Sequence, residues 1–119
     1  MSKTLVVGAS TNPGRYSNIA IRRLVEHNIE TTAFGIRGGT VSEVQIKHNL
    51  DEFQNIDTVT LYLNPKNQEP YYQQILDLKP IRVIFNPGTE NPEFYKLLEA
   101  EGVEVEVACT LVLLATGQY

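Results

Sequence analysis

The chain has few of the residues that stabilise small secreted proteins or build metal sites. Its 119 residues include a single cysteine, Cys109, so no disulfide can form within the chain. A lone cysteine is typical of a protein from a reducing compartment. His27 and His48 lie far apart in the sequence, and no cluster of His, Cys and Asp has the spacing of metal ligands. We therefore expect neither a disulfide scaffold nor a metal centre.

Long apolar runs and a secretion signal are also missing. No apolar run approaches the roughly 20 residues that span a bilayer. Met1-Ser2-Lys3 leads directly into a strand pattern instead of the basic and apolar regions of a signal peptide. The net charge of −4 argues against general nucleic-acid binding. We expect a cytoplasmic protein with neither a membrane nor a nucleic-acid partner.

The composition is that of an ordinary globular protein, with 42% hydrophobic and 20% charged residues. A chain of this length suits one domain, spanning 1–119, and can bury roughly two-thirds of its unfolded surface. The charges are unevenly distributed, because residues 1–40 carry a balance of +3 and the remainder carries −7. A small anion would therefore find its most favourable field near the beginning of the chain.

Strand and helix patterns alternate along the chain. Strand patterns, either apolar and β-branched or alternating, lie at 4–7, 30–34, 58–63, 81–85 and 103–107. Apolar residues at helical spacing predict helices beginning at Ser17, near Tyr71, at Asn91-Pro92 and at Thr110. The stretch 36–56 is less regular, with a short strand near 44–46 and a helical turn near 50–53.

This alternation predicts an α/β fold, a doubly wound parallel five-stranded sheet with helices on both faces. We expect the strand order 3-2-1-4-5, which places a ligand crevice outside the carboxyl end of the first strand. The last strand alternates valine and glutamate, so it should have one wet face and lie at or near an edge.

The residues that follow the first strand have the character of a phosphate-binding loop. The apolar run of 5–7 ends at Gly8, passes through small and hydroxyl-bearing residues, and leads into a helix. Glycine allows close approach to the backbone, and the first turn of a helix offers free N–H groups and a positive dipole end. We expect this loop to hold the phosphates of a nucleotide-type cofactor.

Three predicted loops at the same edge of the sheet contain an Asn-Pro pair. These are Asn12-Pro13, Asn64-Pro65 and Asn86-Pro87. Proline fixes an extended turn, and asparagine supplies both a donor and an acceptor, so each pair alone is ordinary turn chemistry. Three pairs at one edge favour a preformed rim around a ligand.

The first loop differs from the common nucleotide motifs. No Gly-Lys-Ser/Thr follows it, and its glycines, Gly8 and Gly14, are separated by five residues without a middle glycine. The second strand ends at Gly35-Ile36-Arg37, where an NAD site would have an acidic residue. An arginine there suits a ligand with a phosphate on its ribose, such as NADP or coenzyme A (CoA), although a solvated surface residue explains it equally well.

The two main motifs together resemble those of the small CoA-binding domain family, whose members are single Rossmann-like domains similar to the nucleotide domain of succinyl-CoA synthetase. The resemblance rests on residues 8–17, on residues 86–91 and on Cys109. It implies that the first loop and the adjacent helix hold the CoA phosphates. The loop at Gly35 departs from the family's usual Asn-Pro turn. The predicted binding residues are Gly8, Ala9, Ser10, Asn12, Pro13, Arg15, Tyr16, Gly35, Arg37, Asn64, Asn86, Pro87 and Gly88.

No arrangement of nucleophile, base and oxyanion donors is evident, so we expect binding of CoA or an acyl-CoA without catalysis, as in a sensor, carrier or regulatory module. We interpret both histidines as structural and Cys109 as a buried inert thiol that could alternatively face the sulfur end of the ligand. Two other hypotheses stay open, a small NADP-dependent oxidoreductase and a partner-binding module with a vestigial pocket. An exposed tyrosine patch would favour a homodimer.

Overall fold

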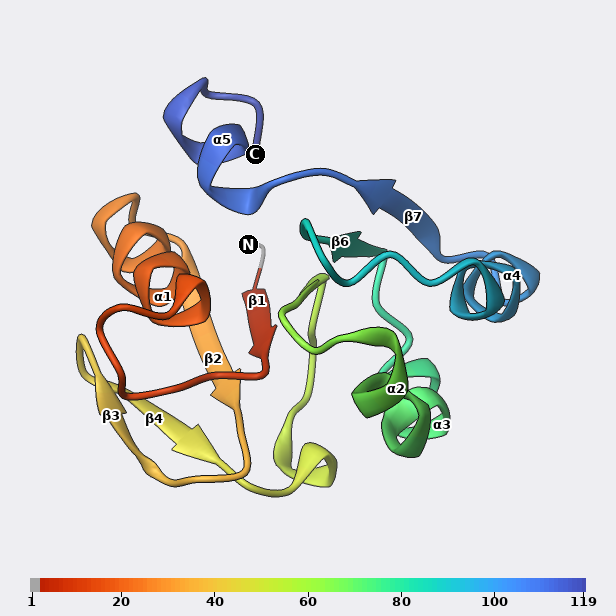
Figure 1. Cartoon of the computed structure of the whole chain (residues 1–119), viewed down its shortest axis with the longest axis horizontal. Helices are drawn as coiled ribbons and strands as arrows, with labels where there is room; N and C mark the ends of the chain where they lie inside the picture. The colour runs from red at the N-terminus through yellow and green to blue at the C-terminus, as the bar shows by residue number, and fades with distance from the viewer. Residues whose placement is uncertain (1–2) are drawn as a thin grey trace.

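The computed structural model describes residues 3–119 and is built on one seven-stranded sheet (Figure 1). The strands are β1 (Lys3–Val7), β2 (Glu30–Phe34), β3 (Gly39–Val41), β4 (Val44–Lys47), β5 (Thr58–Leu61), β6 (Arg82–Phe85) and β7 (Glu104–Val107). Their order is β3-β4-β2-β1-β5-β6-β7. All neighbouring pairs are parallel except β3 and β4, which form an antiparallel hairpin.

Helices cover both faces of the sheet, as Figure 1 shows. One face carries α1 (Tyr16–Glu26) and α5 (Thr110–Ala115). The other carries α2 (Pro65–Gln68), α3 (Tyr72–Asp77) and α4 (Pro92–Ala100), together with single 3-10 turns at Leu50–Glu52 and Glu69–Tyr71. This two-sided cover confirms the predicted α/β class and explains why the central strands are apolar on both faces.

The central strands end at the same level, and this alignment defines one edge of the molecule. Val7 pairs with Phe34 on one side and with Leu61 on the other, and Leu61 in turn pairs with Phe85. The loops that follow these residues therefore begin side by side at the carboxyl edge of the sheet, where doubly wound folds bind their ligands. Val7 and Leu61 are fully buried, so this edge stands on a packed core.

The strand count and the strand order differ from the sequence prediction. We expected five strands and placed the strand of 58–63 outside that of 30–34, whereas β5 lies between β1 and β6. The place beside β2 is taken by β4, a strand of four residues in the irregular stretch. If β4 is counted as the third strand and β3 is left out, the order is 3-2-1-4-5-6, which is typical of doubly wound folds.

Two predicted helices and the last strand also need correction. Helix α1 begins at Tyr16, with Arg15 as its N-cap, so Ser17 is buried in the first turn instead of capping it. The helix expected near Tyr71 is divided into α2, a 3-10 turn and α3. Strand β7 lies at the edge as predicted, but the valines and glutamates do not divide into a buried and a wet face, because Val107 is exposed and Glu106 is half-buried.

No helix within residues 3–119 combines the length and apolar character that a bilayer crossing requires.

Candidate functional site

The predicted binding residues all lie in four loops at the carboxyl edge of the sheet. The loop after β1 and the first turn of α1 hold Gly8, Ala9, Ser10, Asn12, Pro13, Arg15 and Tyr16. The loop between β2 and β3 holds Gly35 and Arg37, the start of α2 holds Asn64, and the loop between β6 and α4 holds Asn86, Pro87 and Gly88. The fold thus brings residues from distant parts of the sequence to one edge.

Gly8 and Ala9 fix the course of the first loop. Gly8 has a φ of +96°, a conformation that favours glycine, and a Cβ on it would stand 3.1 Å from the Tyr62 carbonyl carbon. The N–H groups of Gly8 and Ala9 both donate to the carbonyl oxygen of Phe34, at 2.9 Å each. These two amides are therefore engaged within the protein, and the free donors of the loop lie further along it.

The tip of the loop is held by its own polar side chains. The hydroxyl of Ser10 accepts a hydrogen bond from the Asn12 N–H at 3.1 Å, and Asn12 Oδ1 accepts one from the Gly14 N–H at 2.9 Å. Such turns formed by Ser and Asn side chains preset the backbone conformation. Ser10 and Asn12 consequently shape the loop from within.

Two residues that the sequence analysis did not select support this loop from α1. Asn18 is 3% exposed, and its Nδ2 donates to the Ser10 carbonyl oxygen at 2.9 Å. Arg22 donates from Nε to Asn18 Oδ1 at 2.9 Å and from Nη2 to the Pro13 carbonyl oxygen at 3.2 Å. A polar residue at a buried helical position was the available signal, because such a residue requires a hydrogen-bond partner.

The N-terminus of α1 is open at the end of the loop. Its N-cap, Arg15, makes no side-chain capping bond, and no residue among 3–119 accepts a hydrogen bond from the N–H of Tyr16 or Ser17. Arg15 and Tyr16 are both exposed, and no carboxylate in the described chain pairs with Arg15. Free N–H groups, the positive helix end and an unpaired guanidinium together favour an anion here.

The loop after β2 lies directly against the loop after β1. A Cβ on Gly35 would stand 2.5 Å from the Ala9 carbonyl oxygen, and a Cβ on Gly39 would overlap the Thr11 methyl group. Between these glycines the side chains of Ile36 and Arg37 are exposed, and Arg37 has no carboxylate partner in the part of the chain that the structure describes. The two loops thus form one continuous surface with two unpaired arginines.

The asparagines of the three Asn-Pro pairs differ in burial and in their hydrogen-bond partners. Asn64 is exposed and caps α2 by accepting from the Asn67 N–H at 2.9 Å. Asn86 is 1% exposed and fully engaged. Its Nδ2 donates to Thr60 Oγ1 at 2.7 Å and to the Leu61 carbonyl oxygen at 2.9 Å, and its Oδ1 accepts from the Thr110 N–H at 2.8 Å. Asn86 therefore ties β5, β6 and α5 together instead of presenting its amide to a ligand.

Gln68 joins the loops after β5 and β6 and was also missed by the sequence analysis. It is fully buried, and its Nε2 donates to the carbonyl oxygens of Leu63 and Thr89 at 2.9 and 2.8 Å. Its Oε1 accepts from Asn91 Nδ2 at 2.9 Å. The rim of the site is thus braced from below by buried amides.

Cys109 and Tyr62 lie behind the rim. Cys109 is half-buried at the N-cap of α5, so it is less deeply buried than the inert core thiol we expected. The Tyr62 hydroxyl is buried without a hydrogen-bond partner in the described chain. Burial raises the pKa of Tyr62 to about 12, and the neighbouring Thr110 and Thr60 hydroxyls, which bond each other at 2.8 Å, offset only part of the effect.

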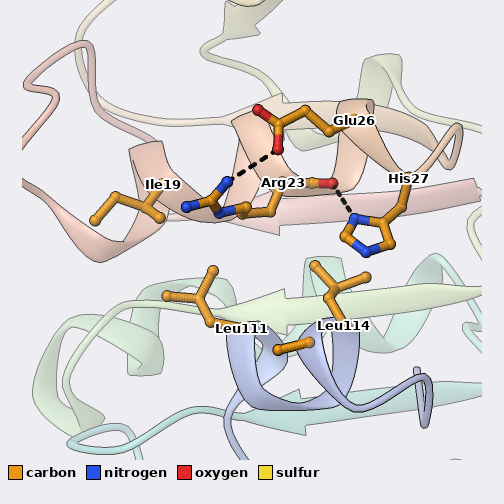
Figure 2. A pocket seen from close by; sticks show the side chains of 7 residues that line it. Ile19, Arg23, Glu26, His27, Leu111 and Leu114 are labelled. Carbon is orange, nitrogen blue, oxygen red and sulfur yellow. Dashed lines mark hydrogen bonds and ion pairs between the residues drawn. The ribbon is translucent and has the colours of Figure 1, made fainter.

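A separate open groove of about 410 Å³ lies between α1 and α5 (Figure 2). It is lined by Ile19, Arg23 and Glu26 of α1, by His27 at the C-terminus of that helix, and by Leu111, Leu114 and Ala115 of α5. Arg23 is paired with Glu26 at 3.0 Å, and His27 Nδ1 lies 2.8 Å from the Arg23 carbonyl oxygen. None of the predicted binding residues lines this groove. No group of three His, Cys, Asp or Glu side chains within residues 3–119 could hold a metal ion.

Comparison with known proteins identifies the family of the chain. Residues 2–115 match the family model described as CoA binding domain. A solved structure of an uncharacterized protein is 44% identical, with a TM-score of 0.96 over 100% of this chain and 98% of that one. No curated protein matches the chain.

Two further solved structures have the same fold as this chain. A hypothetical protein from Pyrococcus horikoshii OT3 is 28% identical, with a TM-score of 0.83 over 93% of this chain and 80% of that one. A protein from Thermus thermophilus is 21% identical, with a TM-score of 0.87 over 99% of this chain and 90% of that one.

Proposed function

The chain belongs to the CoA-binding domain family, and from this membership we propose that it binds CoA or an acyl-CoA at the carboxyl edge of its sheet without transforming it. Its role would be that of a sensor, carrier or regulatory subunit. The ligand lies across the loop after β1 and the loop after β2, which meet where Gly35 contacts Ala9.

The observation that carries the proposal is the open N-terminus of α1. The pyrophosphate of CoA requires several hydrogen-bond donors and positive charge. The free N–H groups of Tyr16 and Ser17 supply the donors, and Arg15 supplies the charge. A helix N-terminus at the end of a glycine-containing loop is a general solution for binding a diphosphate.

Arg37 supports the choice of CoA over a ligand with an unmodified ribose. CoA carries a phosphate on its ribose, and an exposed arginine without an acidic partner suits that group. In this proposal the first loop binds the ligand through its shape, which the Ser10 hydroxyl and the Asn12 amide oxygen hold by accepting hydrogen bonds from the loop backbone.

Isothermal titration calorimetry with CoA, acetyl-CoA, dephospho-CoA and NADPH tests the proposal. We expect heat on titration of CoA and acetyl-CoA, weaker binding of dephospho-CoA, and CoA recovered intact after prolonged incubation. Binding of NADPH with no response to either CoA compound would overturn the assignment. Mass spectrometry of the protein as purified gives an independent check, because a tightly held cofactor would identify itself.

Substitution of Arg15 tests where the phosphates lie. Arg15→Gln should weaken CoA binding about tenfold, because a charge-assisted hydrogen bond contributes about 1.5 kcal/mol or more. Lys96→Gln is the matched control, since it removes the same charge from an exposed position on α4, on the opposite face of the sheet. Equal effects of the two substitutions would indicate a general charge effect and contradict a phosphate site at Arg15.

A further inference from the structure

His48 directly follows β4, and its ring is in contact with the loop that carries Arg37. The Nδ1 atom lies 3.2 Å from the Gly35 carbonyl oxygen. A Cβ on Gly38 would stand 3.1 Å from the Nε2 atom, which is closer than ordinary van der Waals contact. The imidazole therefore touches the loop both before and after Ile36-Arg37.

The opposite side of the same loop is held by the loop after β1. Gly35 lies against the Ala9 carbonyl oxygen and Gly39 lies against Thr11, in both cases closer than a side chain would allow. The segment 35–39 is thus in contact with Ala9 and Thr11 at its ends and with the exposed side chain of His48 at Gly35 and Gly38. These contacts account for the three glycines, each of which stands where another segment approaches the backbone.

A glycine-rich loop needs such contacts if it is to hold an arginine in place. Glycine loses more conformational freedom on ordering than any other residue, and an unsupported loop would lose that freedom each time it bound a ligand. Contacts that order the loop beforehand remove this cost from binding. The Gly35 carbonyl can only accept, so His48 Nδ1 carries the hydrogen in this contact.

We propose that His48 is a positioning residue for the ligand's ribose phosphate: its imidazole, bonded to Gly35 and packed on Gly38, fixes the loop that presents Arg37. The inference rests on the proposed function and adds a determinant of specificity to it. In the sequence the charged neighbours of His48 are Lys47, Asp51 and Glu52, and Lys47 pairs with Glu52 at 3.8 Å.

The ratio of affinities for CoA and dephospho-CoA is the appropriate readout, because the two ligands differ only in the ribose phosphate. In calorimetry, Arg37→Gln should reduce this ratio about tenfold, as expected for the loss of one charge-assisted bond. His48→Leu should reduce the ratio by several-fold while leaving dephospho-CoA binding nearly unchanged. The double variant should match Arg37→Gln alone, because residues that act through one another are not additive.

Two further variants separate positioning from a general loss of stability. His48→Asn keeps a short N–H donor that can reach the Gly35 carbonyl oxygen, so it should restore most of the ratio. His27→Leu removes the other histidine, which is exposed and makes a similar Nδ1 contact, 2.8 Å from the Arg23 carbonyl oxygen, at the far end of α1. It should leave the ratio unchanged.

The outcomes distinguish the two proposals. If the wild-type protein binds neither CoA nor dephospho-CoA, the proposed function is wrong. If it binds both with a clear preference for CoA, and His48→Leu preserves that preference or weakens both ligands equally, the role assigned to His48 is overturned. Additive losses in the double variant would show that His48 acts independently of Arg37 and would also contradict it.

Discussion

Gly35 and Ala9 approach so closely that a Cβ on Gly35 would stand 2.5 Å from the Ala9 carbonyl oxygen. This contact joins the loops after β2 and β1, and both loops carry predicted binding residues. The position therefore requires glycine for packing, whatever the ligand, and its φ lies outside the left-handed region. The closeness of the two backbones is a property of the fold that a substitution can test directly.

Gly35→Ala should destabilise the protein by about 1–3 kcal/mol, because the added methyl group forces the two loops apart. Urea denaturation followed by circular dichroism measures the change. Gly14→Ala is the control, since a Cβ there would meet only Asn12 Oδ1, at an ordinary 3.4 Å, and should change stability by about 0.5 kcal/mol or less. Equal stability of the two variants would mean that the loops can separate freely.

We also predict that the asparagines of two Asn-Pro pairs contribute unequally to the free energy of unfolding. Asn86→Ala should cost about 2–4 kcal/mol of unfolding free energy, because Thr110 N–H and the Leu61 carbonyl would lose buried partners. Asn64→Ala should cost only about 1 kcal/mol, the usual value for an N-cap. Chemical denaturation of both variants gives the comparison. Similar costs would argue against the bracing role of Asn86.

Tyr62 makes stability depend on pH in the alkaline range. Its folded-state pKa is raised from 10.0 to about 12, chiefly by burial, so the folded state retains a proton that the unfolded state loses. The unfolding free energy should therefore fall by up to about 2 kcal/mol as the pH rises from about 10 to 12. Burial also raises the pKa of Tyr119, which adds to this decline.

Tyr62→Phe should flatten this decline and, near neutral pH, add about 1 kcal/mol of stability, because it removes a buried hydroxyl that lacks a partner. Thermal or urea unfolding between pH 7 and 11.5 measures both effects. Tyr95→Phe serves as the comparison, since Tyr95 is also half-buried in the core. An unchanged alkaline slope in Tyr62→Phe would show that other groups cause it.

Substitution of Asn18 tests whether the first loop is ordered before the ligand binds. Asn18→Ala removes the bond to the Ser10 carbonyl oxygen and the support for Arg22. We expect faster hydrogen exchange at residues 10–15 and about tenfold weaker CoA binding, the equivalent of about 1.4 kcal/mol. Asn18→Asp, which keeps the Oδ1 acceptor for Arg22 alone, should lie between Asn18→Ala and the wild type. Unchanged exchange would mean that the loop holds its shape without Asn18.

Much of this architecture follows from local sequence. The strands β1, β2, β5 and β6 are predicted from the local sequence, and α4 from Asn91-Pro92, whose asparagine caps the helix at Phe94. The order of the strands in the sheet could not be predicted from local sequence. It depends on which strand fills the place beside β2, and the short Val44–Lys47 segment has no strong pattern of its own.

The candidate site also has features that local sequence predicts and features that it does not. Loop positions could be predicted, because parallel strands end at one edge and each predicted binding residue follows a strand or begins a helix. The direction of individual side chains could not. Asn12, Asn64 and Asn86 share the same Asn-Pro sequence, yet only long-range contacts such as that between Asn86 and Thr110 distinguish a buried brace from an exposed cap.

The outer strand β7 has a consequence for self-association. Its unpaired backbone edge could add a strand from a second molecule, but Glu104 is exposed on it and Glu106 stands two residues further along. Arg82 neutralises Glu106 from within the sheet, at 2.8 Å, and leaves Glu104 without a cation in the described chain. Copies aligned edge to edge would bring carboxylates together, which discourages continuous sheets and the aggregates that grow from them.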